Sequence, residues 1–146
     1  MELASEQSDT DAEAYQVVDH TADWALRVRG ATLGDLLVNA ALGMASLLVE
    51  EPTAIPLNVE RSLEIYALDA ETLLVDWLSE LAYWAESEQL LFREFELIEV
   101  TVTHLEGQVR GGVADQLTKH IKAVTYHNLE IIETSEGLEA TIVFDV

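Results

Sequence analysis

The sequence predicts a single α+β domain in which two helices pack on a mixed β-sheet as a sandwich. Two central stretches repeat apolar residues at helical spacing, and several others alternate apolar and polar residues with a period of two. These elements follow the order strand, strand, helix, strand, helix and then several strands. With 146 residues and 49% apolar side chains, the chain is long enough to bury one core without disulfides.

The amino-terminal part is expected to be a flexible acidic tail over residues 1–14, followed by one folded domain over residues 15–146. The tail carries five acids and no base, and it lacks the positive start and apolar run of a secretion signal. Residues 15–18 are predicted to form a short strand. Residues 24–29 alternate Trp, Leu and Val with polar side chains, which is typical of a half-buried strand.

The first helix is predicted to start at Thr32, because Asp35 three residues later has the spacing of a capping box. Apolar residues then recur every three or four positions up to Leu48, as on a helix with one buried face. Two prolines break the chain after this helix, and residues 57–67 return to a strand pattern.

The second helix is predicted to begin after the N-cap Asp69 and to run to about Ser87. Trp77 and Trp84 belong to its apolar stripe. Aromatic residues at helical spacing indicate a packed core in preference to a binding groove. The opposite face carries acids without basic partners, which indicates a solvated surface or one that meets a basic protein.

The remainder of the chain is predicted to be rich in β-strands. Residues 98–102 alternate as a strand, a turn is expected at 106–107, and a long strand is expected over 121–133. A second turn at 136–137 would lead into a closing strand over 138–146.

Charge and composition exclude several classes of function. The chain has 28 acids and 7 bases, which give a formal charge of −21. This charge argues against strong direct nucleic-acid binding and against binding to anionic membranes. No run of about 18 apolar residues is present, so a protein of the cytoplasm without a membrane anchor is expected. Cysteine is absent, as are glycine-rich phosphate loops and common hydrolase motifs. A role in RNA metabolism would therefore act through a protein partner.

The segment from Asp19 to Asp23 gathers two carboxylates, the imidazole of His20 and a hydroxyl between two predicted strands. Such residues form either a turn that bonds its own backbone, or a metal or partner site held by rigid strands. A small metal-dependent hydrolase centred on Asp19, His20 and Asp23 is a further hypothesis, which would require a pocket and an open metal position.

The end of the chain is the second candidate. Phe144 can anchor the last strand while Asp145 points to the other face, and Val146 carries the α-carboxylate. Oxygen atoms of this kind suit hard cations, although a solvated chain end is the alternative.

The third stretch holds Lys122 and His127. On a strand, Lys122 would share one face with Val124 and Tyr126, and His127 would lie on the opposite face. Each is either an ordinary strand residue, exposed or hydrogen-bonded, or a contact to a partner.

The sequence resembles the archease family over residues 15–146. The resemblance rests on five segments in the family's order: Asp19-His20-Thr21-Ala22-Asp23, Leu74-Val75-Asp76-Trp77-Leu78 with Glu80-Leu81, Leu91-Phe92, Ile121 to His127, and Phe144-Asp145-Val146. One departure is Asn128, where relatives often carry Asp after the histidine, and it leaves the chemistry of this corner open.

The resemblance implies an accessory protein, not an enzyme. Archeases activate the RtcB-type, GTP-dependent RNA ligase of tRNA splicing and RNA repair by promoting its guanylylation and multiple turnover. An older suggestion for the family is a chaperone-like modulator of a tRNA cytosine methyltransferase. Family members bind a metal, assigned as Ca²⁺, for which the matching positions are Asp23, Asp145 and Val146; Mg²⁺ and Mn²⁺ accept the same oxygen ligands. Asp19, His20, Lys122 and His127 are the expected partner contacts.

Overall fold

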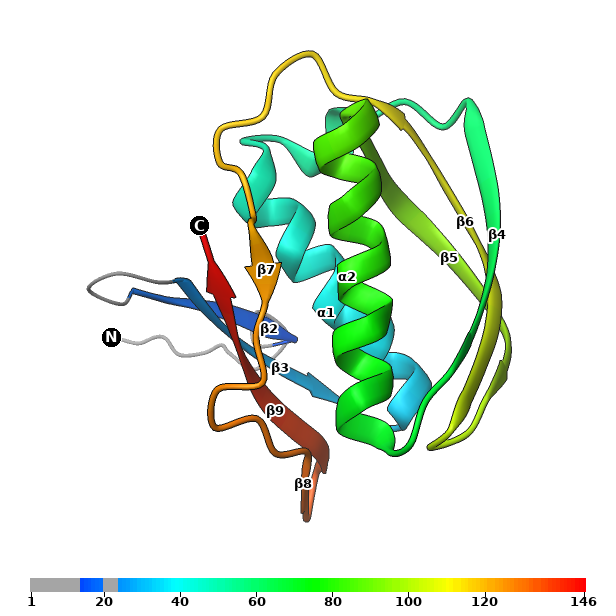
Figure 1. Cartoon of the computed structure of the whole chain (residues 1–146), viewed down its shortest axis with the longest axis vertical. Helices are drawn as coiled ribbons and strands as arrows, with labels where there is room; N and C mark the ends of the chain where they lie inside the picture. The colour runs from blue at the N-terminus through cyan, green and yellow to red at the C-terminus, as the bar shows by residue number, and fades with distance from the viewer. Residues whose placement is uncertain (1–13, 20–23) are drawn as a thin grey trace.

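Two helices lie between two β-sheets in the computed structural model, which describes residues 14–19 and 24–146 (Figure 1). The predicted α+β class and the two packed helices are confirmed. The strands divide into two sheets, one on each side of the helices, and every strand pairing described is antiparallel. Splitting the strands in this way buries both faces of the helical layer.

The first sheet has the strand order β2-β3-β9-β7, and β8 also pairs with β9. Its members are β2 (Tyr15–Asp19), β3 (Trp24–Gly30), β7 (Ala123–Val124), β8 (Ile132–Thr134) and β9 (Gly137–Asp145). The closing strand β9 is therefore central, with β3 on one edge and both β7 and β8 on the other.

The single long strand predicted over residues 121–133 is wrong. The chain pairs with β9 only at residues 123–124 and again at residues 132–134. Between them it leaves the sheet and turns at His127 and Asn128, where Asn128 has a left-handed backbone with φ 51°. Asn tolerates that conformation better than most residues, so a turn forms here although the surrounding residues are typical of a strand.

The second sheet consists of β4 (Val59–Tyr66), β6 (His104–Val113) and β5 (Leu90–Val100), in the order β4-β6-β5. The turn predicted at 106–107 is wrong, because β6 runs straight through these positions. Gly107 allows β6 to lie close to β5, because a Cβ there would lie 2.9 Å from the Glu96 carbonyl oxygen. The β5–β6 turn lies at residues 101–103.

The helix boundaries follow the predicted caps. In α1 (Leu33–Leu48), the Thr32 hydroxyl accepts the Asp35 N–H at 3.1 Å. In α2 (Ala70–Glu88), the Asp69 carboxylate accepts the Thr72 N–H at 2.8 Å. Each cap satisfies one of the amides that a helix start leaves without an internal partner. A short 3-10 helix, η2 (Pro52–Ala54), follows α1.

The core fills the space between the helices and both sheets. Trp77 is fully buried, and its indole N–H donates to the Leu37 carbonyl of α1 at 2.8 Å. Trp84 is half-buried and meets Phe92 edge-on, with ring centroids 5.5 Å apart. Both tryptophans therefore contribute to packing, as predicted.

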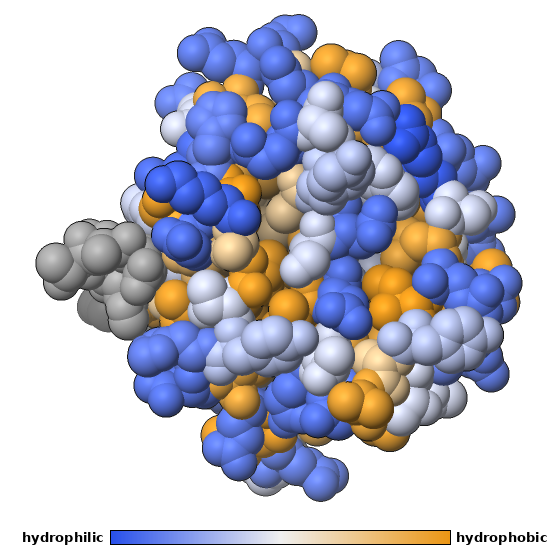
Figure 2. All heavy atoms as spheres, viewed as in Figure 1, coloured by the Kyte–Doolittle hydropathy of each residue, from blue (hydrophilic) through white to orange (hydrophobic). Residues whose placement is uncertain are grey.

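The outer surface mixes residue types. Figure 2 shows hydrophilic side chains over much of one face, with smaller hydrophobic areas between them. In the part of the chain that the structure describes, neither helix is long and apolar enough to cross a membrane.

Candidate functional site

One end of the first sheet brings together segments that are far apart in the sequence (Figure 1). The backbone register aligns Asp19 with Trp24, Trp24 with Phe144, and Phe144 with Val124. Adjacent strands lie about 4.8 Å apart, so the backbones of Asp19 and Phe144 are separated by about 10 Å. The strands that flank residues 20–23 are thus the first and second neighbours of β9 at this end of the sheet.

The end of β9 is held from both sides. Phe144 is completely buried and faces the core, which leaves the next residue, Asp145, exposed. The Lys122 N–H donates to the Asp145 carbonyl at 2.7 Å, and the Thr125 N–H donates to the Val143 carbonyl at 3.0 Å. The Asp145 carboxylate therefore projects from a strand that has a neighbour on each edge.

The last residue, Val146, is also held in place. Its side chain is half-buried and packs against the hydrophobic core. Burial of this apolar side chain restricts where the backbone oxygens of Val146 can lie. Asp145 and Val146 therefore lie together at the end of the central strand β9.

The two lysines of the chain, Lys119 and Lys122, both belong to this region. The Lys119 ammonium lies 4.0 Å from the centroid of the Trp24 indole, which is a cation–π contact. Lys122 is exposed and is bonded through its backbone to Asp145. In a chain with a formal charge of −21, both lysines therefore come from the segment that lies alongside the end of β9. We call Trp24, Lys119, Lys122, Asp145 and Val146 the strand-end site.

His127 is not part of this arrangement. The register of β7 ends at Val124, and His127 lies three residues beyond it in an exposed turn. Its backbone N–H donates to the Thr125 hydroxyl at 3.3 Å, and its ring lies 3.4 Å from the Asn128 amide nitrogen. The predicted alternation of faces holds at the strand itself, where Ala123 is exposed and Val124 buried, but it does not extend to His127.

Comparison with known proteins identifies the family. The model of the archease protein family (MTH1598/TM1083) matches residues 15–146. The chain belongs to the archease family. The archease of Methanosarcina barkeri is 34% identical over 140 residues, covering 90% of this chain and 95% of that protein. The archease of Archaeoglobus fulgidus is 33% identical over 136 residues, covering 90% and 98%.

Two solved structures are similar to the archease fold described here. The solution structure of Methanobacterium thermoautotrophicum protein 1598 has a TM-score of 0.75 and 27% identity, covering 92% of this chain and 99% of that one. The crystal structure of a Thermotoga maritima archease, described as a possible chaperone, has a TM-score of 0.61 and 22% identity, covering 88% and 94%. The second likeness supports the fold alone.

Several archease positions predicted from the sequence lie outside the described residues. These are His20 and Asp23; Asp19 ends β2, but only its backbone is described. Among residues 14–19 and 24–146, no group of three or more His, Cys, Asp or Glu side chains is arranged to hold a metal. The described part contributes the Asp145 carboxylate and the Val146 oxygens, which are donors of the type that hard cations prefer. The metal site formed by Asp23, Asp145 and Val146 stays a prediction.

A second polar cluster, which sequence reasoning missed, lies on the second sheet. The two ring nitrogens of His104 contact Glu64 at 2.7 Å and Glu99 at 2.5 Å. Tyr66 stacks on the His104 ring at a centroid distance of 4.4 Å and donates its hydroxyl to Glu64 at 2.8 Å. The hydrogen bond to Glu64, with that to Glu99, raises the pKa of His104 although partial burial opposes the shift. The same bond to His104 lowers the pKa of Glu64.

This cluster ties the three strands of the second sheet together. Tyr66 and His104 are direct partners in the register of β4 and β6, while Glu99 comes from β5. The sequence predicted strand character at residues 57–67 and 98–102, but not through residues 106–107 of β6, where a turn was expected. Which exposed residue faces which was not predictable, because that depends on strand register.

Proposed function

We propose that this archease is an accessory protein that activates an RtcB-type, GTP-dependent RNA ligase by promoting ligase guanylylation and multiple turnover. Membership of the archease family supports the proposal. The single structural observation that carries it is the convergence at the strand-end site, where Asp145, Val146 and Lys122 meet the strands that flank residues 20–23. An activator needs to present such groups rigidly to another protein and need not carry out chemistry itself.

The strand-end site is suited to contact by its construction. Asp145 is exposed, while Phe144 beside it is buried and the strand is paired on both edges. A partner that binds such an end has little backbone entropy to remove, so more of the contact energy appears as affinity. In our proposal Lys122 would contact the ligase, and so would Asp19, His20 and His127, the other partner contacts expected from the resemblance.

A divalent cation is part of the proposal. Asp23, Asp145 and Val146 would hold Ca²⁺, or Mg²⁺ or Mn²⁺, which all accept oxygen ligands. Bound there, the cation would supply positive charge to the Asp145 carboxylate. The role of the protein is to hold Asp145 and Val146 on a fixed strand.

The experiment measures transfer of labelled GMP to a matched RtcB-type ligase and the number of RNA ligations per ligase, with and without this protein. We expect both to rise. Asp145→Ala should reduce the activation by about tenfold or more, as removal of a metal-site group commonly does.

Glu136→Ala is the matched control, because it removes an exposed carboxylate from the β8–β9 turn, far along the same sheet. Unchanged guanylylation with the wild-type protein would refute the function. Full activation by Asp145→Ala would refute the role of the strand-end site. Calorimetric titration with CaCl₂, MgCl₂ and MnCl₂ tests the cation separately, and equal affinity of Asp145→Ala and wild type would exclude Asp145 as a ligand.

A second candidate function is a chaperone-like modulator of a tRNA cytosine methyltransferase. It is favoured by the description of the Thermotoga maritima archease structure as a possible chaperone. This function predicts that the protein suppresses aggregation of the methyltransferase on heating, or alters its site preference on tRNA, without any effect on ligase guanylylation.

A further inference from the structure

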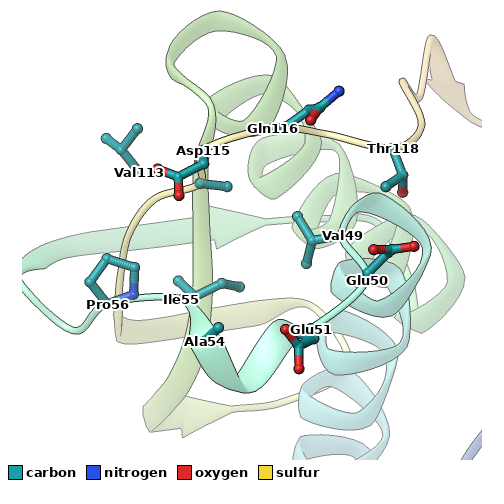
Figure 3. A pocket seen from close by; sticks show the side chains of 11 residues that line it. Val49, Glu50, Glu51, Ala54, Ile55, Pro56, Val113, Asp115, Gln116 and Thr118 are labelled. Atoms are coloured by element: carbon teal, nitrogen blue, oxygen red, sulfur yellow. The ribbon is translucent and has the colours of Figure 1, made fainter.

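A hollow with an apolar floor lies at the carboxyl end of α1 (Figure 3). Its volume is about 550 Å³, and it is lined by residues from the segment after α1, from η2, and from the end of β6 with the segment after it. Val49, Ile55 and Ala114 form its buried apolar part. Three segments that are distant in the sequence therefore build one concave surface.

Three exposed carboxylates surround this floor. Glu50 and Glu51 follow the C-cap residue of α1, and Asp115 comes from the segment after β6. In Figure 3 the Asp115 side chain lies across the hollow from those of Glu50 and Glu51. None of the ion pairs found among residues 14–19 and 24–146 involves these three carboxylates.

The charge at this place is unfavourable for the free protein. The carboxyl end of a helix carries partial negative charge, so acids beside it are destabilising and bases are favourable. The last turn of α1 has no base, and its C-cap residue Val49 is followed by two acids. The Leu47 and Leu48 carbonyls are approached by the neutral hydroxyl of Thr118, at 3.4 and 3.1 Å. A cation in the hollow would remove this electrostatic conflict.

The walls of the hollow are held by hydrogen bonds. The Thr118 N–H donates to the Leu48 carbonyl at 2.7 Å. Gln89 and Ala114 exchange two bonds, of 2.8 and 2.9 Å, and the Arg93 guanidinium donates to the Ile55 carbonyl at 2.7 Å. A ligand would thus meet a preformed surface and would have little loop ordering to cause.

We propose that this hollow is a docking site for an arginine or lysine side chain of a protein partner. The apolar stem of such a side chain would pack on the apolar lining of the hollow, in which Pro56 and Val113 are exposed, and its cationic head would lie among the carboxylates of Glu51 and Asp115. A bare metal ion does not suit the hollow, because its floor is apolar and metal ligands must converge within about 2.6 Å of one point. Charge complementarity therefore selects a cation with an apolar body.

The position of the hollow favours a protein as the source of this side chain. Thr118 lines the hollow, and the next residue, Lys119, belongs to the strand-end site. A partner surface that covers one can extend to the other along the same segment (Figure 1). The inference adds a second contact to the proposed function without depending on it, since its test uses the isolated protein.

The test is an NMR titration of the ¹⁵N-labelled full chain with acetyl-Leu-Arg-Leu-amide. The control peptide replaces arginine by citrulline, which has the same shape without the charge. We expect amide shifts at residues 49–51 and 114–118, with a dissociation constant on the order of 1 mM that weakens as salt is added. Equal binding of the citrulline peptide, or no shifts at these residues, would overturn the proposal.

Two double variants separate the site from the overall negative charge. Glu51→Gln with Asp115→Asn should weaken binding of the arginine peptide about two- to fivefold for each carboxylate removed. Glu130→Gln with Glu133→Gln removes the same charge near β8, at the opposite end of the molecule in Figure 1, and should leave the affinity unchanged. Equal weakening by both pairs would show general attraction to an acidic protein and would refute the docking site. The ¹⁵N spectrum of each variant reports at the same time that it is folded.

Discussion

Trp77 provides the sharpest test of how the helical layer is held together. Its indole is fully buried, donates to the Leu37 carbonyl at 2.8 Å and meets Phe95 edge-on, with ring centroids 5.8 Å apart. Trp77→Phe keeps an aromatic ring in the same place. It removes the hydrogen bond between α2 and α1 and leaves a small void.

The expected loss follows from two contributions. A buried hydrogen bond contributes about 1 kcal/mol, and the unfilled volume costs about 1–2 kcal/mol more. Leu37 lies inside α1, so its carbonyl still accepts a helical hydrogen bond and the larger penalty for an orphaned group does not apply. The free energy of unfolding should therefore fall by about 2–3 kcal/mol, which for 146 residues corresponds to a melting temperature lower by about 5–10 °C.

Urea and thermal unfolding followed by circular dichroism measure this loss. Trp84→Phe is the matched control on the same helix: Trp84 is half-buried, and no hydrogen bond to its indole is found in the described part of the chain. Its loss should be about 1 kcal/mol or less. If the two variants lose the same free energy within about 0.5 kcal/mol, the buried bond to Leu37 does not stabilise the layer and the reasoning is wrong.

Three further predictions concern the sheets. Because the pKa of His104 is raised, its pairing with Glu64 stabilises the fold fully below about pH 6.5 and is lost as the pH rises through the folded pKa. His104→Gln should thus lower the urea midpoint more at pH 6 than at pH 9, and an equal effect at both would contradict the pairing. Lys119→Ala should shift the fluorescence of Trp24 and lower the free energy of unfolding by about 0.5–1 kcal/mol. Lys119→Arg should keep the wild-type fluorescence and stability. An unaltered spectrum in Lys119→Ala would exclude the cation–π contact. Gly111→Ala should lower the free energy of unfolding by more than about 3 kcal/mol or prevent folding, because its Cβ would overlap a backbone carbonyl of β5. Wild-type stability in this variant would refute the close packing of β6 on β5 at Gly111.

Local signals in the sequence were sufficient for the helices. Thr32 and Asp69 are caps whose side chains bond amides three residues ahead, so their effect depends on neighbours in the chain alone. Strand boundaries were less predictable. Residues 121–133 have strand composition throughout, yet only two short pieces pair with β9, since pairing depends on a partner far away in sequence.

The candidate site divides in the same way. Asp145 and Lys122 were singled out as unusual from their types, and the structure joins them through the backbone bond between Lys122 and Asp145. His127 was expected on the same strand as Lys122, whereas the structure places it in an exposed turn; its role as a partner contact stays a prediction. Nothing in the sequence pointed to the contact between Lys119 and Trp24, which lie 95 positions apart.

The sequence by itself determined the two capped helices, the apolar stripe that buries Trp77 and the acidic net charge, which argues against strong direct RNA binding. These properties depend on residue type and on spacing within one element. Only the tertiary structure decided that the strands form two sheets, that β9 lies between β3 and β7, and that Asp145 therefore lies beside Lys122. Strand order and register are set by which apolar faces can be buried together, and that choice is made by the whole chain at once.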